Sequence, residues 1–205
     1  MVNTIAFTLL LVVSFGFFIY SMRNIISYLK IGKPENRLNN IKQRIINTIN
    51  IAFLQSKLFR SKFAGLLHAS IFWGFCVLLL LVIEGFLEGY IHNFSFAFLG
   101  KFYSLITITQ DVFGYLVLVT VTFSLIRRYI GTPERLKDKS SRPDATLILI
   151  LIILVMLTMI GMNIEKVFLG TIRGARPITI YLAGLINNDG SENMYRIFWW
   201  AHNIV

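Results

Sequence analysis

The residues from Ala145 to Met162 read ATLILILIILVMLTMIGM and contain no charged side chain. An α-helix rises about 1.5 Å per residue, so a run of about twenty apolar residues can cross the hydrocarbon core of a bilayer. Comparable runs lie at about 4–22, 64–86 and 105–126, and a fifth begins near residue 196. The sequence therefore predicts an all-α, polytopic transmembrane helical bundle with four full spans plus the start of a fifth.

The composition supports the same class. Of the 205 residues 56% are hydrophobic, and the mean hydropathy is +0.68, whereas a soluble domain needs more polar surface to face water. We expect one membrane domain over residues 1–205, truncated in its fifth helix, and no separate soluble domain. The first span has no basic segment before it and no small-residue cleavage site after it. We therefore interpret it as a retained helix and not as a removed signal peptide.

The net charge of +10 is distributed unevenly along the chain. The segments 23–62 and 127–144 hold 15 of the 20 Lys and Arg residues, and the predicted spans place both segments on one face of the membrane. Cationic loops stay cytoplasmic according to the positive-inside rule. This predicts a multi-pass protein of a prokaryotic inner (plasma) membrane, with the N-terminus outside and with no nucleic-acid partner.

The segments between the spans differ in character. Apolar residues recur at steps of three and four over residues 38–52, which predicts an amphipathic helix on the cytoplasmic membrane surface or against a partner there. The segment 131–144 is polar, charged and interrupted by two prolines, so it is expected to be a loop. An outer loop of about thirty residues is expected after Glu165, with its clearest turn at residues 187–190.

Polar and ionisable side chains inside a membrane are costly, so each is a functional candidate. The only cysteine, Cys76, lies in an apolar run, which excludes an intrachain disulfide and a Cys-based iron–sulfur cluster or zinc site within these residues. The polar and ionisable residues inside or at the ends of the spans are His68, Glu84, Gln110, Asp111 and His202.

His68 and His202 are candidate axial ligands of haem iron, because neutral imidazole is a common ligand and helix bundles present such ligands inward. The alternative is a histidine that is hydrogen-bonded to a backbone carbonyl or to a neighbouring helix. The two histidines enter the membrane from opposite faces, so their levels differ by roughly 10–15 Å. Two nitrogens on one iron are only about 4 Å apart, so the two residues cannot share one haem.

Lys101 and Asp111 are tentative quinone-binding residues. They lie with Glu84 and Gln110 near the outer ends of the second and third spans. A quinone headgroup needs hydrogen-bond donors beside an apolar slot, and proton release needs an ionisable group near water. The alternative for Lys101 and Asp111 is an interfacial ion pair.

Several short motifs resemble those of a known family. The segment Phe53–His68, FLQSKLFRSKFAGLLH, is followed by Phe-Trp-Gly-Phe at residues 72–75 and resembles the membrane domain of heterodisulfide-reductase-type iron–sulfur proteins. Gln-Asp-Val-Phe-Gly at 110–114, Arg-Arg-Tyr at 127–129 and Phe-Trp-Trp-Ala-His at 198–202 extend the match. The same five-helix domain is similar to the gamma subunit of respiratory nitrate reductase, a di-haem cytochrome b.

The resemblance implies electron transfer between a quinone pool and a cytoplasmic iron–sulfur or disulfide-reducing module, in the same longer chain or in a separate subunit, through one or two b haems. His68 matches the ligand of the haem nearer the cytoplasm, whose second ligand lies about five helical turns beyond His202. His202 matches a ligand of the outer haem. The family places the partner of His202 at the position of Leu78, which cannot ligate iron. A mono-haem protein or a different ligand therefore stays open.

A histidine and three methionines are possible substitutes for the missing ligand. His92 lies outside the apolar run, where a solvated loop histidine is the more common case. Met156, Met159 and Met162 recur at steps of three, and a thioether can be an axial ligand, but core packing by Met is far commoner.

Electron transfer would make the chain a component of an oxidoreductase. A second function class, a membrane protein without a cofactor, also stays open. A haem-free membrane anchor needs only apolar spans and a basic docking loop, and the chain has both. A small transporter often carries inverted repeats and broken helices, and neither is evident in this sequence.

Overall fold

The structure is a computed structural model that describes residues 4–33, 35, 39–91, 94–130, 142–186 and 189–205. It contains helices and no strand within these ranges, which confirms the all-α class. The predictions for Leu38, for His92, for the loop 131–141 and for the turn at 187–188 lie outside the described residues.

Four helices are long and apolar enough to cross a membrane. They are α1 (Thr4–Ile31), α3 (Lys62–Tyr90), α4 (Lys101–Tyr129) and α5 (Arg142–Phe168). Each extends beyond the apolar run that predicted it. A helix of 29 residues such as α3 is about 43 Å long, which exceeds a hydrocarbon core of about 30 Å. The additional turns carry the more polar residues at the helix ends.

The chain divides into two compact units, Met1–Arg60 and Ser61–Val205. The first unit holds α1, α2 (Ile41–Thr48), the π-helical turn η1 (Ile49–Phe53) and the short η2 (Leu58–Arg60). The expected amphipathic helix is thus present over residues 41–53. Its apolar stripe is exposed among the described residues, and its attachment to a membrane surface or a partner stays a prediction.

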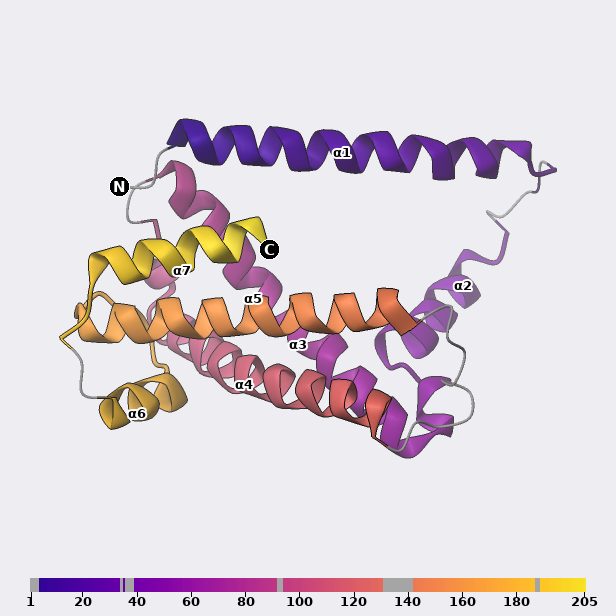
Figure 1. The fold of residues 1–205 in the computed structure, drawn as a ribbon. Coiled ribbons are helices and arrows are strands. Elements are labelled where there is room, and N and C mark those ends of the chain that lie inside the picture. The colour runs from indigo at the N-terminus through magenta and orange to yellow at the C-terminus, as the bar shows by residue number, and fades with distance from the viewer. Residues whose placement is uncertain (1–3, 34, 36–38, 92–93, 131–141, 187–188) are drawn as a thin grey trace. The chain divides into compact units, whose positions relative to one another are not determined.

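The second unit is a helical bundle. Helix α4 packs between α3 and α5, and α7 (Glu192–Ile204) packs along α5, as Figure 1 shows. The core lies where α3, α4 and α5 meet. It consists of Leu78, Val117, Val121, Met156, Met159 and Ile160. Two of the three methionines that were considered as ligands are therefore core residues, and Met162 packs against the same cluster.

A glycine lies at the α3–α4, α4–α5 and α5–α7 crossings of this bundle. A Cβ atom at Gly74 of α3 would overlap the side chain of Val117 on α4. A Cβ at Gly114 would lie 2.8 Å from Met159 of α5, and one at Gly161 would lie 2.7 Å from the ring of Phe198 on α7. Small residues let membrane helices approach closely and gain dispersion contacts. These glycines therefore set the spacing of α3, α4, α5 and α7.

Helix α6 (Pro177–Leu185) lies in the segment that was expected to be a loop of about thirty residues, so that expectation was wrong in part. Its nine residues, PITIYLAGL, are too few to span a membrane. Pro177 is in the first turn, where proline is favoured because its missing N–H has no intrahelical partner there. The helix packs against α5 and α4. A short 3-10 helix, η3 (Phe96–Leu99), precedes α4.

Replacing Gly74 with Ala is expected to lower the free energy of unfolding by about 1–3 kcal/mol, because Val117 is a buried, β-branched side chain that cannot move aside. Gly85 of the same helix is the matched control, since a Cβ there would meet nothing within 4 Å. Thermal unfolding of both variants in detergent measures the difference. Equal midpoints for Gly74→Ala and Gly85→Ala would contradict the role assigned to this crossing.

Candidate functional site

Asp111 fixes the start of α6. Its Oδ2 accepts hydrogen bonds from the backbone N–H groups of Ile178 (2.7 Å) and Thr179 (3.2 Å), and its Oδ1 accepts one from the Thr179 hydroxyl (2.5 Å). A helix N-terminus has free N–H groups and a positive end of the helix dipole, and both favour a carboxylate. Asp111 of α4 thus caps a helix that is distant in sequence, and both of its oxygens are used.

The residues just before α6 are held by α4 as well. Thr107 is fully buried, and its Oγ1 accepts a hydrogen bond from the N–H of Ala175 (2.9 Å). Gly174 has a φ of +72° and lies so close to Thr107 that a side chain would collide with it. Only glycine combines this backbone conformation with such a close approach. The loop between α5 and α6 is therefore anchored one helical turn from Asp111.

A second buried acid, Glu165 near the end of α5, has the same role. Its Oε2 accepts a hydrogen bond from the N–H of Ser191 (2.8 Å), and the Ser191 side chain in turn accepts from the N–H of Met194 at the start of α7. Lys166 beside it forms an ion pair with Glu88 of α3 (3.5 Å). These contacts join the ends of α3 and α5 to the start of α7.

Lys101 and Asp111 are not brought together. Lys101 is the first residue of α4 and is exposed, whereas Asp111 is 3% exposed. Ten residues along one helix separate the two by about 15 Å. The structure therefore contains no ion pair between them, and their joint role at a quinone stays a prediction.

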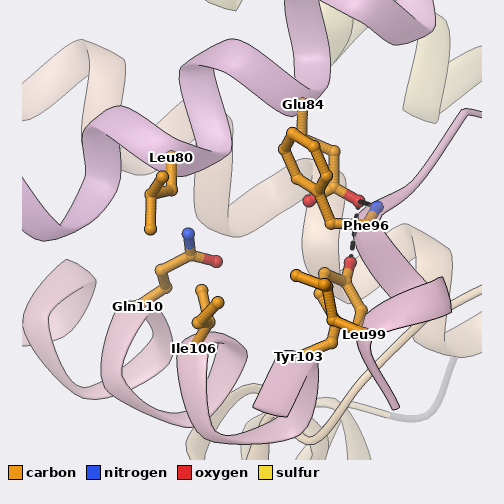
Figure 2. A pocket seen from close by; sticks show the side chains of 7 residues that line it. All are labelled: Leu80, Glu84, Phe96, Leu99, Tyr103, Ile106 and Gln110. Atoms are coloured by element: carbon orange, nitrogen blue, oxygen red, sulfur yellow. Dashed lines mark hydrogen bonds between the residues drawn. The ribbon is translucent and has the colours of Figure 1, made fainter.

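Glu84 and Gln110, two other candidates from the sequence, line one small pocket between α3 and α4. The pocket has an internal volume of about 110 Å³, and Figure 2 shows the side chains around it. By the same measure a single water molecule needs only about 10–15 Å³. Apart from Glu84, Gln110 and Tyr103, the lining is apolar and consists of Leu80, Phe96, Leu99 and Ile106.

Glu84 is 7% exposed, and among the described residues it is hydrogen-bonded through one of its two oxygens. Oε1 accepts hydrogen bonds from the Tyr103 hydroxyl (2.8 Å) and from the N–H of Phe96 (3.2 Å). The Tyr103 oxygen accepts a further bond from the hydroxyl of Ser95 (3.2 Å). The other carboxylate oxygen, Oε2, is directed toward the side of the pocket where Gln110 lies (Figure 2).

Gln110 differs from these hydrogen-bonded side chains of the site. Its side chain is 1% exposed, and neither its Nε2 nor its Oε1 has a hydrogen-bond partner among the described residues. A buried amide without partners costs about 1–3 kcal/mol. Such a group in a native protein indicates that a water molecule or a ligand bonds to it.

Arg176 is a buried cation close to this pocket and is 4% exposed. Burial lowers the pKa of its guanidinium, and neighbouring groups counteract this effect; they are Tyr103, Asp111 and Glu84. A buried charge is stable only when it is paired. The positive charge of Arg176 therefore helps to balance the negative charges of Asp111 and Glu84.

His202 is placed on α7 beside the middle of α5. Its Nδ1 lies 3.2 Å from the carbonyl oxygen of Val155 and 3.1 Å from the Thr158 hydroxyl. An Nδ1–H that donates to a carbonyl leaves the lone pair on Nε2, which is the tautomer that binds metals. Nε2 itself makes no hydrogen bond with a described residue. The role of His202 as a haem ligand stays a prediction.

His68 lies in the second turn of α3 and is exposed among the described residues. Its neighbours Gly65 and Ala69 are buried on another face of the helix. No group of three or more His, Cys, Asp and Glu side chains that could hold a metal ion is found in the described part of the chain. The haem predictions for His68 and His202 therefore depend on one histidine each. At Leu78, where the resemblance expected a second ligand, the structure has a core residue that is 7% exposed.

Sequence reasoning missed three residues of the site: Ser95, Tyr103 and Arg176. Tyr103 and Ser95 carry no periodic or motif signal, because their positions depend on how the segment between α3 and α4 folds back. A tyrosine about two helical turns before Gln110 and Asp111 was the only available signal.

The chain is similar to two curated proteins. It is 28% identical over 206 aligned positions to "Probable iron-sulfur-binding oxidoreductase FadF" of Bacillus subtilis (strain 168), which covers 98% of this chain and 28% of that protein. It is 33% identical over 182 positions to "EtfAB:quinone oxidoreductase" of Syntrophomonas wolfei, covering 82% of this chain and 25% of that protein. The chain therefore spans about a quarter of the length of these relatives.

No family model and no solved structure matches the chain. Both relatives are named as oxidoreductases, one with iron–sulfur binding and one with quinone. This agrees with the redox part of the resemblance that the motifs indicated. Neither name refers to a haem or to nitrate reductase. The comparisons thus support a similarity to redox proteins, over a segment that in this chain holds four helices long and apolar enough to span a membrane.

Proposed function

We propose that this chain is the membrane part of an electron-transfer oxidoreductase, and that it exchanges electrons with a quinone whose headgroup binds in the Gln110 pocket. The observation that carries the proposal is the buried, unbonded amide of Gln110 beside the carboxylate of Glu84. The names of the two relatives support the reaction class.

The chemistry of the pocket suits a quinone. A quinone ring has two carbonyl oxygens, and the amide Nε2 of Gln110 is a donor for one of them. A quinol has two hydroxyl groups, for which Gln110 Oε1 and Glu84 Oε2 are acceptors. The apolar remainder of the lining accepts the ring, as in most small-molecule sites.

The edge of the pocket provides a path for an apolar tail. Leu80 and Leu99 line the pocket and are 44% and 42% exposed among the described residues. Phe98 and Phe102, close to Leu99 in the sequence, are also exposed among the described residues. In a membrane these side chains face hydrocarbon, which a polyprenyl tail can share without a desolvation cost. The tail would therefore leave the pocket directly into the bilayer.

The electrons would pass through b-type haem, for which His202 and His68 are the proposed ligands. Haem supplies reversible one-electron chemistry between the two-electron quinone and a further redox centre. The Nδ1 contact of His202 with the Val155 carbonyl supports its role as a ligand through Nε2. The expected partner is a cytoplasmic iron–sulfur or disulfide-reducing module, and the greater length of both relatives is compatible with such a module in the same chain.

Replacing Gln110 with Leu removes both amide groups at similar volume and is expected to raise the KM for a short-tailed quinol about tenfold or more. The loss of one or two hydrogen bonds to a bound ligand is of this size. The exposed Lys101 offers the contrasting variant, because it does not line the pocket. Steady-state oxidation of the quinol by the purified holoenzyme measures both.

If Gln110→Leu keeps the KM of the wild type, the proposal that the quinone headgroup binds in the Gln110 pocket is contradicted. If Lys101→Ala instead abolishes quinol oxidation, the headgroup binds near Lys101 and not in the Gln110 pocket.

The haem proposal predicts a b-type band in the difference between dithionite-reduced and oxidised optical spectra of the full-length protein. The His202→Ala and His68→Ala variants are expected to lower the haem content. Asn203→Ala, which changes the next residue of α7, should keep it. A wild-type protein without any b-type band would contradict the haem proposal. It would favour the alternative function, a haem-free membrane anchor or a small transporter.

A further inference from the structure

The pocket is connected to the end of the bundle by a chain of hydrogen bonds. The Ser95 hydroxyl donates to the Tyr103 oxygen (3.2 Å), and the Tyr103 hydroxyl donates to Glu84 Oε1 (2.8 Å). Ser95 is half-buried and lies in the segment that joins α3 to η3, while Glu84 and Tyr103 are almost fully buried. The chain therefore runs from the lining of the pocket to a residue with access to solvent.

We propose that Glu84, Tyr103 and Ser95 form a proton route between the Gln110 pocket and the aqueous phase at the η3 end of the bundle. This inference rests on the proposed quinone reaction and assigns its proton transfers to named groups. Glu84 is the proton-exchanging group at the ring, because its Oε2 faces the pocket while its Oε1 is bonded to Tyr103 (Figure 2).

The reaction requires such a route. Oxidation of a quinol breaks two O–H bonds and produces a quinone, two protons and two electrons. The electrons pass one at a time to the one-electron centres of the proposed electron-transfer chain, and each proton must reach water. Reduction of a quinone is the reverse: it takes up two electrons and two protons and forms two O–H bonds. An apolar pocket cannot hold a free proton, so an ionisable side chain must accept or supply it.

The hydrogen bonds have a direction. Ser95 donates to Tyr103 and Tyr103 donates to Glu84, so both hydroxyl protons point toward the carboxylate. This is the arrangement that delivers a proton inward: Glu84 gains the tyrosine proton, Tyr103 gains the serine proton, and Ser95 is reprotonated by water. Rotation of the two hydroxyl groups after proton release restores or reverses the orientation. The same chain thus serves uptake and release.

Neighbouring groups keep this route separate from the structural acids. The N–H of Phe96 holds Glu84 Oε1 in place (3.2 Å), and Arg176 provides a positive charge near Glu84 and Tyr103. Asp111 bonds to α6 through both oxygens and is not part of the chain. Glu84 is therefore the acid among these that has one oxygen directed into the pocket.

The Glu84→Gln variant tests the route. Glutamine keeps the size and can still accept the bonds from Tyr103 and Phe96, but it cannot exchange a proton. The kcat of the holoenzyme with a short-tailed quinol is expected to fall about 10²-fold, the usual contribution of a general acid or base, while the KM stays within about twofold. Formate, a small carboxylic acid, should restore part of the rate.

Tyr103→Phe, which breaks the chain but keeps the ring, should lower kcat in the same way. Tyr115→Phe is the matched control on the same helix, because the Tyr115 hydroxyl contacts Thr179 and not Glu84. It should leave kcat unchanged.

The outcomes separate the two proposals. A wild-type kcat in Glu84→Gln overturns the proton route and leaves the quinone pocket standing. A slow variant with a strongly raised KM and no rescue by formate also overturns it, because Glu84 would then only hold the pocket together. If the wild-type holoenzyme does not react with any quinol, the proposed function fails first, and the route fails with it.

Discussion

The rest of this structure depends on one constraint: inside an apolar medium, a buried polar group must have a hydrogen-bond partner. Helices satisfy their own backbone, but the segments that connect them do not. In this chain Glu84, Asp111 and Glu165 provide the missing acceptors. Each is buried on a long helix and accepts the backbone N–H groups of a segment that would otherwise leave them unpaired. The acids thereby fix η3, α6 and the start of α7.

This arrangement also produces the pocket. Because Glu84 binds Phe96 and Tyr103, η3 folds back over the gap between α3 and α4 and closes one side of it. Gln110 lies next to Asp111 on α4, but its amide is left without a partner among the described residues. In this structure the neighbouring acids are hydrogen-bonded, whereas the buried amide of Gln110 is not. The amide therefore marks a specific place for a ligand. The proposed function follows from that exception.

Much of the architecture could be predicted from the sequence. The four long helices follow from apolar runs such as 145–162, because length and hydropathy alone decide whether a segment can cross a bilayer. The polar candidates Glu84, Gln110 and Asp111 were found by the cost of placing them in such runs. Which of these side chains is hydrogen-bonded, and to which segment, was not predictable, since it depends on tertiary contacts with Ile178, Thr179 and Phe96. Helix α6 was missed because nine apolar residues within a loop resemble neither a span nor an amphipathic surface helix.

The central claim is that a quinone ring binds between α3 and α4 beside Gln110. Photoaffinity labelling of the full-length protein with an azido-quinone, followed by peptide mass spectrometry, tests it most directly. The account predicts that the label is attached to residues of the 80–110 segment that line the pocket, and that excess unlabelled quinone prevents the attachment. Competable labelling confined to α5 and α7, with none in the 80–110 segment, would contradict it.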